Sequence, residues 1–399
     1  MAIPLSDHDI EALLYICTYG LTRRSSNQQG TKIDSWMLSS LGFNHCIVSL
    51  DLRNILIRVS MGIFNDDDLF HLRIFNAICC CHYQFSVGYG RPVAIDSSYA
   101  DLHKLILQFP TATVGDAIKV AELELYELLA KESGQDSAGD DSYYESSTSS
   151  PILSFSSLTE WRSSWEKIIS KDITQGLNLS YYFSHIMKGR RIIQEKGHQD
   201  DPTLPLAYNT ACQYSFEIIN RLLELPESSV RGTPSFHLSQ IVYACATLFD
   251  FLDTMKPTER KMSLNLISKV YWHLNKSGEQ INVATDTIAR LIRKLVELAS
   301  NHQPMEYKQT VGFVGTGSIT EQYIRKRHIK RRDSQQQRRL SVEDLPGLAK
   351  GGRVPIKESP EPFSTTPSSD VEFQLPDVSN FENFEDFFYD IFKPEQAGL

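Results

Sequence analysis

The sequence has no apolar run long enough to cross a lipid bilayer. A membrane-spanning helix needs about 20 largely apolar residues, and the longest candidate, Ile241 to Leu252, is shorter and contains Asp250. The first residues show no basic segment leading into an apolar one, so no secretory signal is expected. We therefore predict a protein without a membrane partner.

The sequence also has no cysteine pattern typical of a disulfide framework or a zinc site. Its seven cysteines form no CxxC pair, and three of them are consecutive, so that these three cannot all face one metal ion. Because all seven have apolar or aromatic neighbours, we predict reduced, buried thiols. No Ser-His-Asp, metal-ligand or paired-carboxylate arrangement is present either, so we predict neither catalytic nor cofactor-binding residues.

Charge is distributed unevenly along the chain, which carries a net charge of −9 at pH 7. Residues 322–341 contain eight Lys or Arg and one Asp, whereas residues 370–395 contain eight Asp or Glu and one Lys. A basic run followed by an acidic, aromatic segment is typical of chain regions that bind partners and do not build a core.

Hydrophobic periodicity predicts an all-α fold. Apolar residues recur at helical spacing through residues 8–130 and again through residues 157–302, and no convincing alternating strand is present. We expect one multi-helix regulatory domain with helices near residues 10–17, 33–57, 71–87, 116–131, 161–169, 206–225, 236–255, 261–274 and 281–298.

Two regions have compositions that favour disorder. Residues 133–157 include ten Ser, four acidic residues and no Lys or Arg, which cannot bury enough apolar surface to offset the entropy of ordering. We therefore predict a disordered loop at 133–157 between helical blocks at 1–132 and 158–302. Beyond them we predict a disordered basic linker at 303–369 and an acidic-aromatic tail at 370–399.

Two segments carry a family resemblance. The first, Asp34 to Phe43, contains Trp36 and Gly42 and leads into an apolar helix. The second runs from His71 through an aromatic helix and ends in Phe85-Ser86-Val87-Gly88-Tyr89-Gly90-Arg91-Pro92. Together they resemble the middle homology region of fungal zinc binuclear cluster (Zn2Cys6) transcription factors. The amino-acid sequence of these segments is most similar to that of the subgroup containing the leucine-biosynthesis activator and the secreted-protease regulator.

This resemblance implies the regulatory portion of a nuclear factor that controls RNA polymerase II transcription of metabolic genes, and no enzymatic activity. The cysteine cluster that holds zinc in the family does not occur in the sequence. We also expect that the helices which normally precede the first segment are missing, so that the block at 1–132 is truncated at its start. Zinc is therefore expected only with a missing N-terminal cluster. DNA contact should be indirect or non-specific, through phosphates. A small-molecule effector and a second copy of the chain are open as further partners.

The glycines of the second segment predict a tight exit from the aromatic helix. Gly88, Gly90 and Pro92 would form this exit, since glycine adopts φ values that other residues resist. Arg91 would cap carbonyl groups at the end of the helix, where the helix dipole favours a cation.

The basic run predicts a nuclear import signal, read by an import receptor, and the alternative is a solvated charged helix. Ser334 and Ser341 each follow Arg-Arg-x, which predicts phosphorylation that would offset the local positive charge. The residues of the predicted signal are Arg325, Lys326, Arg327, Lys330, Arg331 and Arg332.

The acidic tail predicts an activation segment. Its aromatic side chains would stay exposed among carboxylates and dock into a hydrophobic groove of a transcription coactivator. The alternative is a terminal helix that folds back on the core. The aromatic residues are Phe381, Phe384, Phe387, Phe388 and Phe392.

A second function hypothesis comes from the apolar stretch that leads into Gly315-Thr316-Gly317. This short sequence resembles the phosphate-binding turn of a dinucleotide domain. If it is one, the chain is a fragment of a nucleotide-dependent enzyme. Such a turn should open an apolar helix in a βαβ unit, but Arg325-Lys326-Arg327 follows soon after it. The regulatory interpretation is therefore the leading one.

Overall fold

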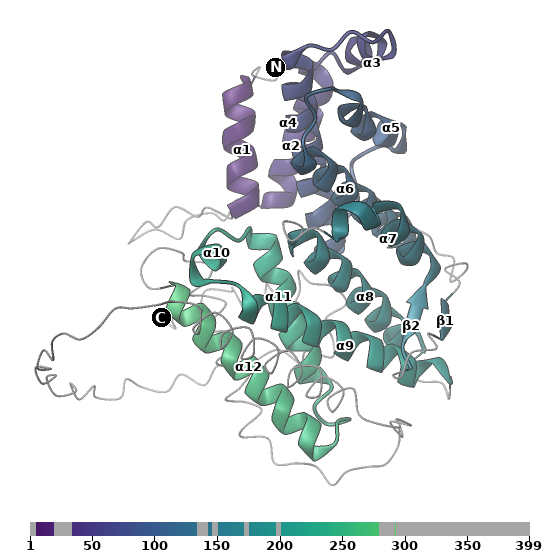
Figure 1. Cartoon of the computed structure of the whole chain (residues 1–399), viewed down its shortest axis with the longest axis vertical. Coiled ribbons are helices and arrows are strands. Elements are labelled where there is room, and N and C mark those ends of the chain that lie inside the picture. Colours follow the sequence, from purple (N-terminus) through teal and green to yellow (C-terminus); the bar gives the residue numbers. More distant parts are fainter. Residues whose placement is uncertain are drawn as a thin grey trace, which may run out of the picture. The chain divides into compact units, whose positions relative to one another are not determined.

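Helices make up most of the part of the chain that the structure describes (Figure 1). The computed structural model describes residues 5–19, 34–133, 143–145, 151–170, 175–196, 201–278 and 292, which belong to one unit. The all-α prediction is confirmed over this part of the chain. None of its helices combines the length and the apolar character needed to cross a membrane.

The first helical block contains six α-helices, counting only described residues. Asp34 caps the second of them, since its carboxylate accepts hydrogen bonds from the backbone N–H groups of Trp36 at 2.8 Å and Met37 at 3.4 Å. The single helix expected over 33–57 is in fact two, separated at Leu50 and Asp51. The α-helices are α1 Asp7–Tyr19, α2 Ser35–Ser49, α3 Leu52–Ser60, α4 Asp66–Gly88, α5 Ala100–His103 and α6 Val114–Ser133. Two short 3-10 helices, η1 Ser97–Tyr99 and η2 Lys104–Gln108, flank α5.

Helix α4 is the centre of this block. It packs against α1, α2 and α6, and every residue from Ile78 to Gly88 is buried. A helix enclosed on all sides can be apolar all round, which explains why Cys79, Cys80 and Cys81 are consecutive. All seven cysteines are free and buried, as predicted.

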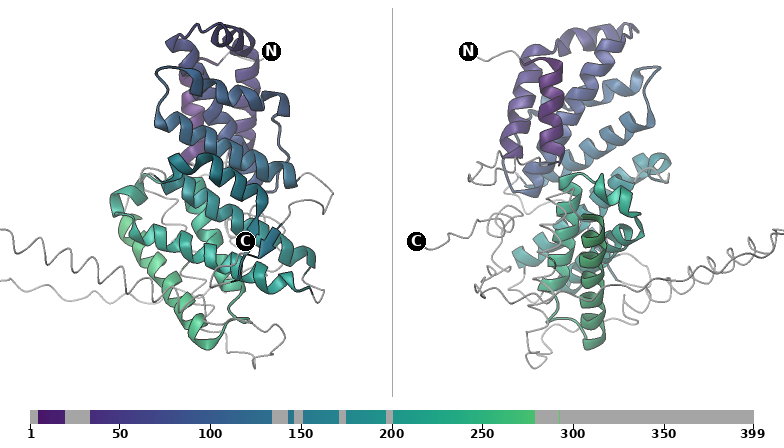
Figure 2. Two further views of the ribbon diagram at one scale, coloured as in Figure 1. Left: turned by 45° about the vertical axis from the view of Figure 1, so that its right-hand side comes forward. Right: turned by 90° about the vertical axis from the view of Figure 1, so that its left-hand side faces the viewer.

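The second helical block surrounds α11, Ser235–Asp250. Most of its residues from Phe236 onward are buried, which confirms the expected central helix, although it ends before the predicted residue 255. Helix α11 packs on α8 Gln175–Lys196, α9 Thr203–Glu224 and α12 Pro257–Gly278, and the block also contains α7 Ser156–Ile169 and α10 Glu227–Arg231. Figure 2 shows this block in teal and green. Of the helix expected over 281–298 only Ile292 is described, and it is helical and buried.

The predicted disordered loop was wrong in part. Strand β1, Tyr143–Glu145, pairs antiparallel with β2, Leu153–Phe155, and α7 begins at Ser156. In β2 the alternate side chains of Leu153 and Phe155 are buried, in a cluster with Leu158 and Trp161. These few apolar residues bury enough surface to order the end of a Ser-rich segment. Residues 134–142 and 146–150 lie outside the described part.

We expect Phe155→Ala to lower the free energy of unfolding by about 3–5 kcal/mol, as for other buried aromatic side chains. Phe155 is only 2% exposed, so the truncation leaves a cavity. Urea denaturation of the full chain measures the change. Ser154→Ala, on the opposite face of the same strand, is the matched control and should have little effect. Equal stabilities for the two variants would show that β2 does not pack as described.

Candidate functional site

The two family segments meet where the beginning of α2 lies against the last turns of α4. We call this the motif corner, formed by Trp36, Ser39, His82, Ser86 and the residues that follow α4. The indole Nε1 of Trp36 donates to Ser86 Oγ at 3.1 Å and to the carbonyl oxygen of Pro92 at 3.1 Å. The side chain of Trp36, in the first family segment, therefore contacts both α4 and the residues that follow α4 in the second family segment.

His82 is the buried polar residue of the motif corner. Its Nε2 accepts a hydrogen bond from the backbone N–H of Ala94 at 2.9 Å, so the proton belongs on Nδ1, which lies 3.2 Å from Ser39 Oγ. Ser39 in turn donates to the carbonyl oxygen of Trp36 at 2.9 Å. Burial lowers the pKa of His82 to about 4. The imidazole is therefore neutral at pH 7 and serves as a fixed hydrogen-bonding link.

The exit from α4 follows the predicted glycine turn at Gly90, whose φ is 62°. The N–H of Arg91 donates to the carbonyl oxygen of Ser86 at 2.8 Å, which is the bond that closes a Schellman-type helix end. The guanidinium of Arg91 lies over the ring of Trp36 at 5.3 Å and 3.4 Å from a carboxylate oxygen of Asp34. Arg91 thus joins the end of α4 to the beginning of α2.

Gly88 has a different role from the one predicted, because it is the last helical residue of α4 and has no positive φ. A Cβ at this position would lie 2.7 Å from Cε2 of Phe236, on α11. Glycine is needed here for a close approach between helices. Phe85 meets the same ring edge-on, with centroids 6.0 Å apart. Gly42 is similar, since a Cβ there would lie 3.1 Å from Ile78 Cδ1.

A second cluster, which the sequence reasoning missed, lies between α4, α6, α8 and α11. Its centre is Glu122, whose carboxylate accepts hydrogen bonds from Lys119 at 2.8 Å and from Gln84 at 2.9 Å. Nε2 of His237 lies 3.5 Å from the same carboxylate. We call this cluster the polar core; its members are Gln84, Lys119, Glu122, Tyr126, Ser180, His237 and Gln240.

Hydrogen bonds extend the polar core across the second block. Tyr126 donates to Ser180 at 2.8 Å and accepts from Gln240 at 2.8 Å. Burial by itself would raise the pKa of Glu122, but Lys119 and His237 outweigh it and hold this pKa well below its usual range. The carboxylate is therefore ionised and paired. A sign of this cluster was present in the sequence: Lys119 and Glu122, three residues apart, interrupt the apolar stripe of α6.

The other predicted functional residues lie outside the described part of the chain. They are the import signal at 325–332, the phosphorylation positions Ser334 and Ser341, the aromatic residues of the tail and the Gly315-Thr316-Gly317 turn. Among the described residues no group of three or more His, Cys, Asp or Glu side chains is arranged to hold a metal ion, so none of them fits a zinc cluster.

The helical part of the chain matches a known protein family. A family model described as the middle domain of the transcriptional activator of proteases prtT matches residues 1–297. The chain belongs to this family. Residues 1–297 form its middle domain, which confirms the family resemblance found in the sequence.

Two relatives of this PrtT-like middle domain align with nearly the whole chain, beyond the residues that the family model matches. Uracil catabolism protein 2 of Saccharomyces cerevisiae is 31% identical over 97% of the chain and 50% of its own length. The protein of the same name from Lachancea kluyveri is 30% identical over 97% of the chain and 54% of its own length. The prtT activator of Aspergillus niger is 27% identical over 70% of the chain and 40% of its own length. The chain thus spans about half the length of the first two relatives. No solved structure matches it.

We expect Gly88→Ala to destabilise the PrtT-like middle domain by about 1–3 kcal/mol, the usual cost of overpacking. The added methyl group would lie 2.7 Å from Phe236, whose ring is held by Phe85, Tyr126 and Phe183. Thermal unfolding measures the effect. Gly115→Ala is the matched control, because the nearest atom to its Cβ is 3.5 Å away. An equal loss in both variants would contradict the close approach.

Stability of the PrtT-like middle domain should fall on acidification. Burial lowers the pKa of His82 and His103 to about 4, and burial with Lys188 and Arg162 lowers that of His185 to about 3, from 6.5. The unfolded chain therefore binds protons below pH 6.5 that the folded chain does not, so this stability is present above pH 6.5 and lost as pH falls toward 4.

The expected loss between pH 7 and pH 5 is about 2 kcal/mol for each of the three histidines. Urea denaturation at the two pH values measures it. His185→Phe removes one of the three groups, so this variant should lose less stability on acidification than the parent. A free energy of unfolding that does not change between pH 7 and pH 5 would be the contrary result.

Proposed function

We propose that the chain is the regulatory and activating part of a nuclear factor that controls RNA polymerase II transcription of nutrient-catabolic genes. The observation that carries this proposal is the family match over residues 1–297. The names of the relatives support the choice of genes, since one set concerns uracil catabolism and the other proteases. The same relationship supports the proposed nuclear location.

The described helices support a regulatory role over a catalytic one. The buried histidines His82, His103 and His185 are each 2% exposed or less, and burial holds their pKa values far below 7, so they are not placed to exchange protons with a substrate. The polar core joins four helices, so a partner that moves one of them acts on the others. The alternative, a nucleotide-dependent enzyme fragment, depends on Gly315 to Gly317, which lie beyond the family match. A thermal shift with NAD or NADP would favour that alternative.

Partner binding is assigned to the sequence beyond the family match. In this proposal an import receptor binds the basic run at 325–332, with Ser334 and Ser341 as phosphorylated positions beside it. A coactivator binds the acidic-aromatic tail, 370–399. Each Phe buried in a coactivator groove would contribute roughly 1.5–3 kcal/mol before ordering costs, so that two or three contacts give reversible binding. The small-molecule effector stays a prediction.

We expect residues 370–399 to activate a reporter gene when they are fused to an unrelated DNA-binding domain. Changing Phe384, Phe387 and Phe388 together to Ala should abolish this activity, because the aromatic contacts supply the affinity. Glu385→Gln with Asp386→Asn is the matched control and should weaken it less, since it keeps the aromatic side chains.

Reporter output and fusion-protein abundance are measured together. If the triple Phe variant activates as strongly as the parent fusion at equal abundance, the tail is not an activation segment. The proposal of an activating role would then be lost, and the membership of the middle domain in its family would remain.

A further inference from the structure

Helix α12 has an exposed face with basic side chains and no acidic one. Its opposite face packs on α9, α10 and α11, and its one acidic residue, Glu259, is buried. The exposed residues are three or four positions apart, which places them along one side of the helix. We call them the α12 face; beyond Pro257 the exposed and described residues are Thr258, Lys261, Asn265, Lys269, Trp272 and Lys276.

The lysines of the α12 face are not neutralised within the described part of the chain. On α12 the described ion pair joins Arg260 to Asp253, and Lys261, Lys269 and Lys276 form none with a described residue. Three positive charges therefore lie in a line on a surface that the fold leaves open.

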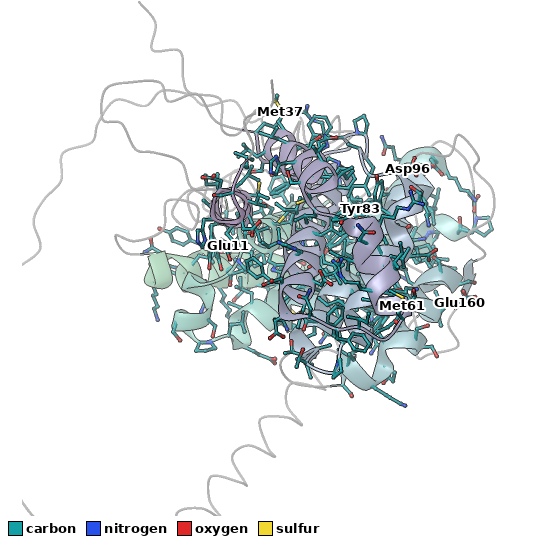
Figure 3. All side chains as sticks on the ribbon, turned by 90° about the horizontal axis from the view of Figure 1, so that it is seen from above. Glu11, Met37, Met61, Tyr83, Asp96 and Glu160 are labelled. Carbon is teal, nitrogen blue, oxygen red and sulfur yellow. The ribbon has the colours of Figure 1, made fainter. Side chains whose placement is uncertain are left out.

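Other described surfaces differ from the α12 face. Helix α8 is also basic, but Arg190, Arg191 and Lys196 are each held in an ion pair at 2.6 to 3.0 Å. The exposed side of α2 is apolar, and its Met37, 62% exposed, lies at the outer edge of the helices in Figure 3. Unpaired positive charge along one helix face is thus a local property of α12.

Every side chain of the α12 face is a hydrogen-bond donor. The ammonium groups of lysine and the indole of tryptophan donate and cannot accept, whereas the amide of Asn265 and the hydroxyl of Thr258 can do both. Trp272 is 59% exposed. A positively charged surface of donors complements a negatively charged surface of acceptors, such as phosphate or carboxylate oxygens.

We propose that the α12 face contacts the phosphate backbone of duplex DNA without reading its sequence. The choice of DNA rests on the proposed function, which places the chain at its target genes. Lysine is depleted from protein–protein interfaces, whereas protein–DNA interfaces are much more positively charged. Because the whole chain has a net charge of −9, a contact with DNA requires a local surface of positive charge, and the α12 face is one.

The dimensions of the α12 face fit a duplex. At the rise of an α-helix, Lys261 lies about 12 Å from Lys269 along the axis, and Lys269 about 10 Å from Lys276. Phosphates on one strand advance by about 3.4 Å along the duplex axis, so each interval spans about three of them. Asn265 and Trp272 lie between the lysines, where their N–H groups can donate to phosphate oxygens.

The salt dependence of DNA binding by the full chain tests the proposal. Each phosphate contact contributes about 0.9 to the slope of log affinity against log salt, so Lys261→Gln, Lys269→Gln and Lys276→Gln together should lower the slope by about 2.7. Between about 50 and 200 mM salt the affinity of the parent should then fall about 40-fold further than that of the triple variant. Fluorescence anisotropy of a labelled duplex measures both, and a duplex of unrelated sequence should give the same result.

The matched control changes three exposed lysines on other helices, Lys104, Lys131 and Lys167, to Gln. It alters the net charge by the same amount and should keep the slope of the parent. The basic run at 325–332 is present in all of these proteins, so its contribution cancels in the comparison. Arg in place of the three lysines of the α12 face should restore the slope, which would show that the lost property is charge and not folding.

The emission of Trp272 gives a second measurement. Addition of duplex DNA should change the tryptophan emission of the parent, because the indole of Trp272 lies within the proposed contact. Trp272→Phe should remove this change, since the other three tryptophans, Trp36, Trp161 and Trp165, lie on α2 and α7. The same change in the Trp272→Phe variant as in the parent would contradict the proposal.

Other results would also overturn the contact. They are an unchanged slope in the α12 triple variant, an equal loss of slope in the control, and a full chain that binds no duplex at low salt. Polyglutamate is the competing probe: if the triple variant loses polyglutamate binding and keeps DNA binding, the partner is an acidic protein. The reporter test of residues 370–399 does not involve α12, so failure of that test and failure of this one are distinguishable.

Discussion

The ring of Phe236 is packed where the two helical blocks meet. It is 2% exposed and presses against Gly88 at the end of α4, where no side chain fits. Its edge-on contacts reach Phe85 of α4, Tyr126 of α6 and Phe183 of α8. Gly88 and Phe85 belong to the second family segment. This segment of the first helical block therefore also forms the surface on which Phe236 of the second helical block packs. The second family segment, the polar core and the central helix α11 thus share one contact.

The polar core lies next to this contact and adds specificity more than stability. A buried ion pair such as Lys119–Glu122 loses hydration that its attraction only partly restores, so it is weak support for the fold as a whole. Its directional hydrogen bonds nevertheless require α4, α6, α8 and α11 to adopt one relative position. Apolar packing alone would not impose this requirement. In a regulatory domain this matters, since a surface that partners read must be presented in a single arrangement.

Local sequence signals were sufficient for what depends on local structure. The periodicity of α4 and α9, the positive φ of Gly90 and the burial of the cysteines are properties of a segment and its immediate neighbours. Gly88 was assigned to a turn because its true partner, Phe236, lies far along the chain and leaves no local trace. The order at Leu153 and Phe155 was missed because composition averaged over the Ser-rich segment outweighed two apolar residues. The place of Glu122 was missed for the same reason as Gly88, as its partners come from three other helices.

The strand pair has a practical consequence for those who handle the protein. Its register joins Glu145 to Leu153 and Tyr143 to Phe155, so the two ends of the intervening segment are fixed as neighbours by the fold itself. Insertions succeed where both ends of the insertion point already lie together at the surface of a rigid frame. A fluorescent reporter or an affinity tag placed between residues 145 and 151 would thus leave both ends of the chain available for fusion to other modules.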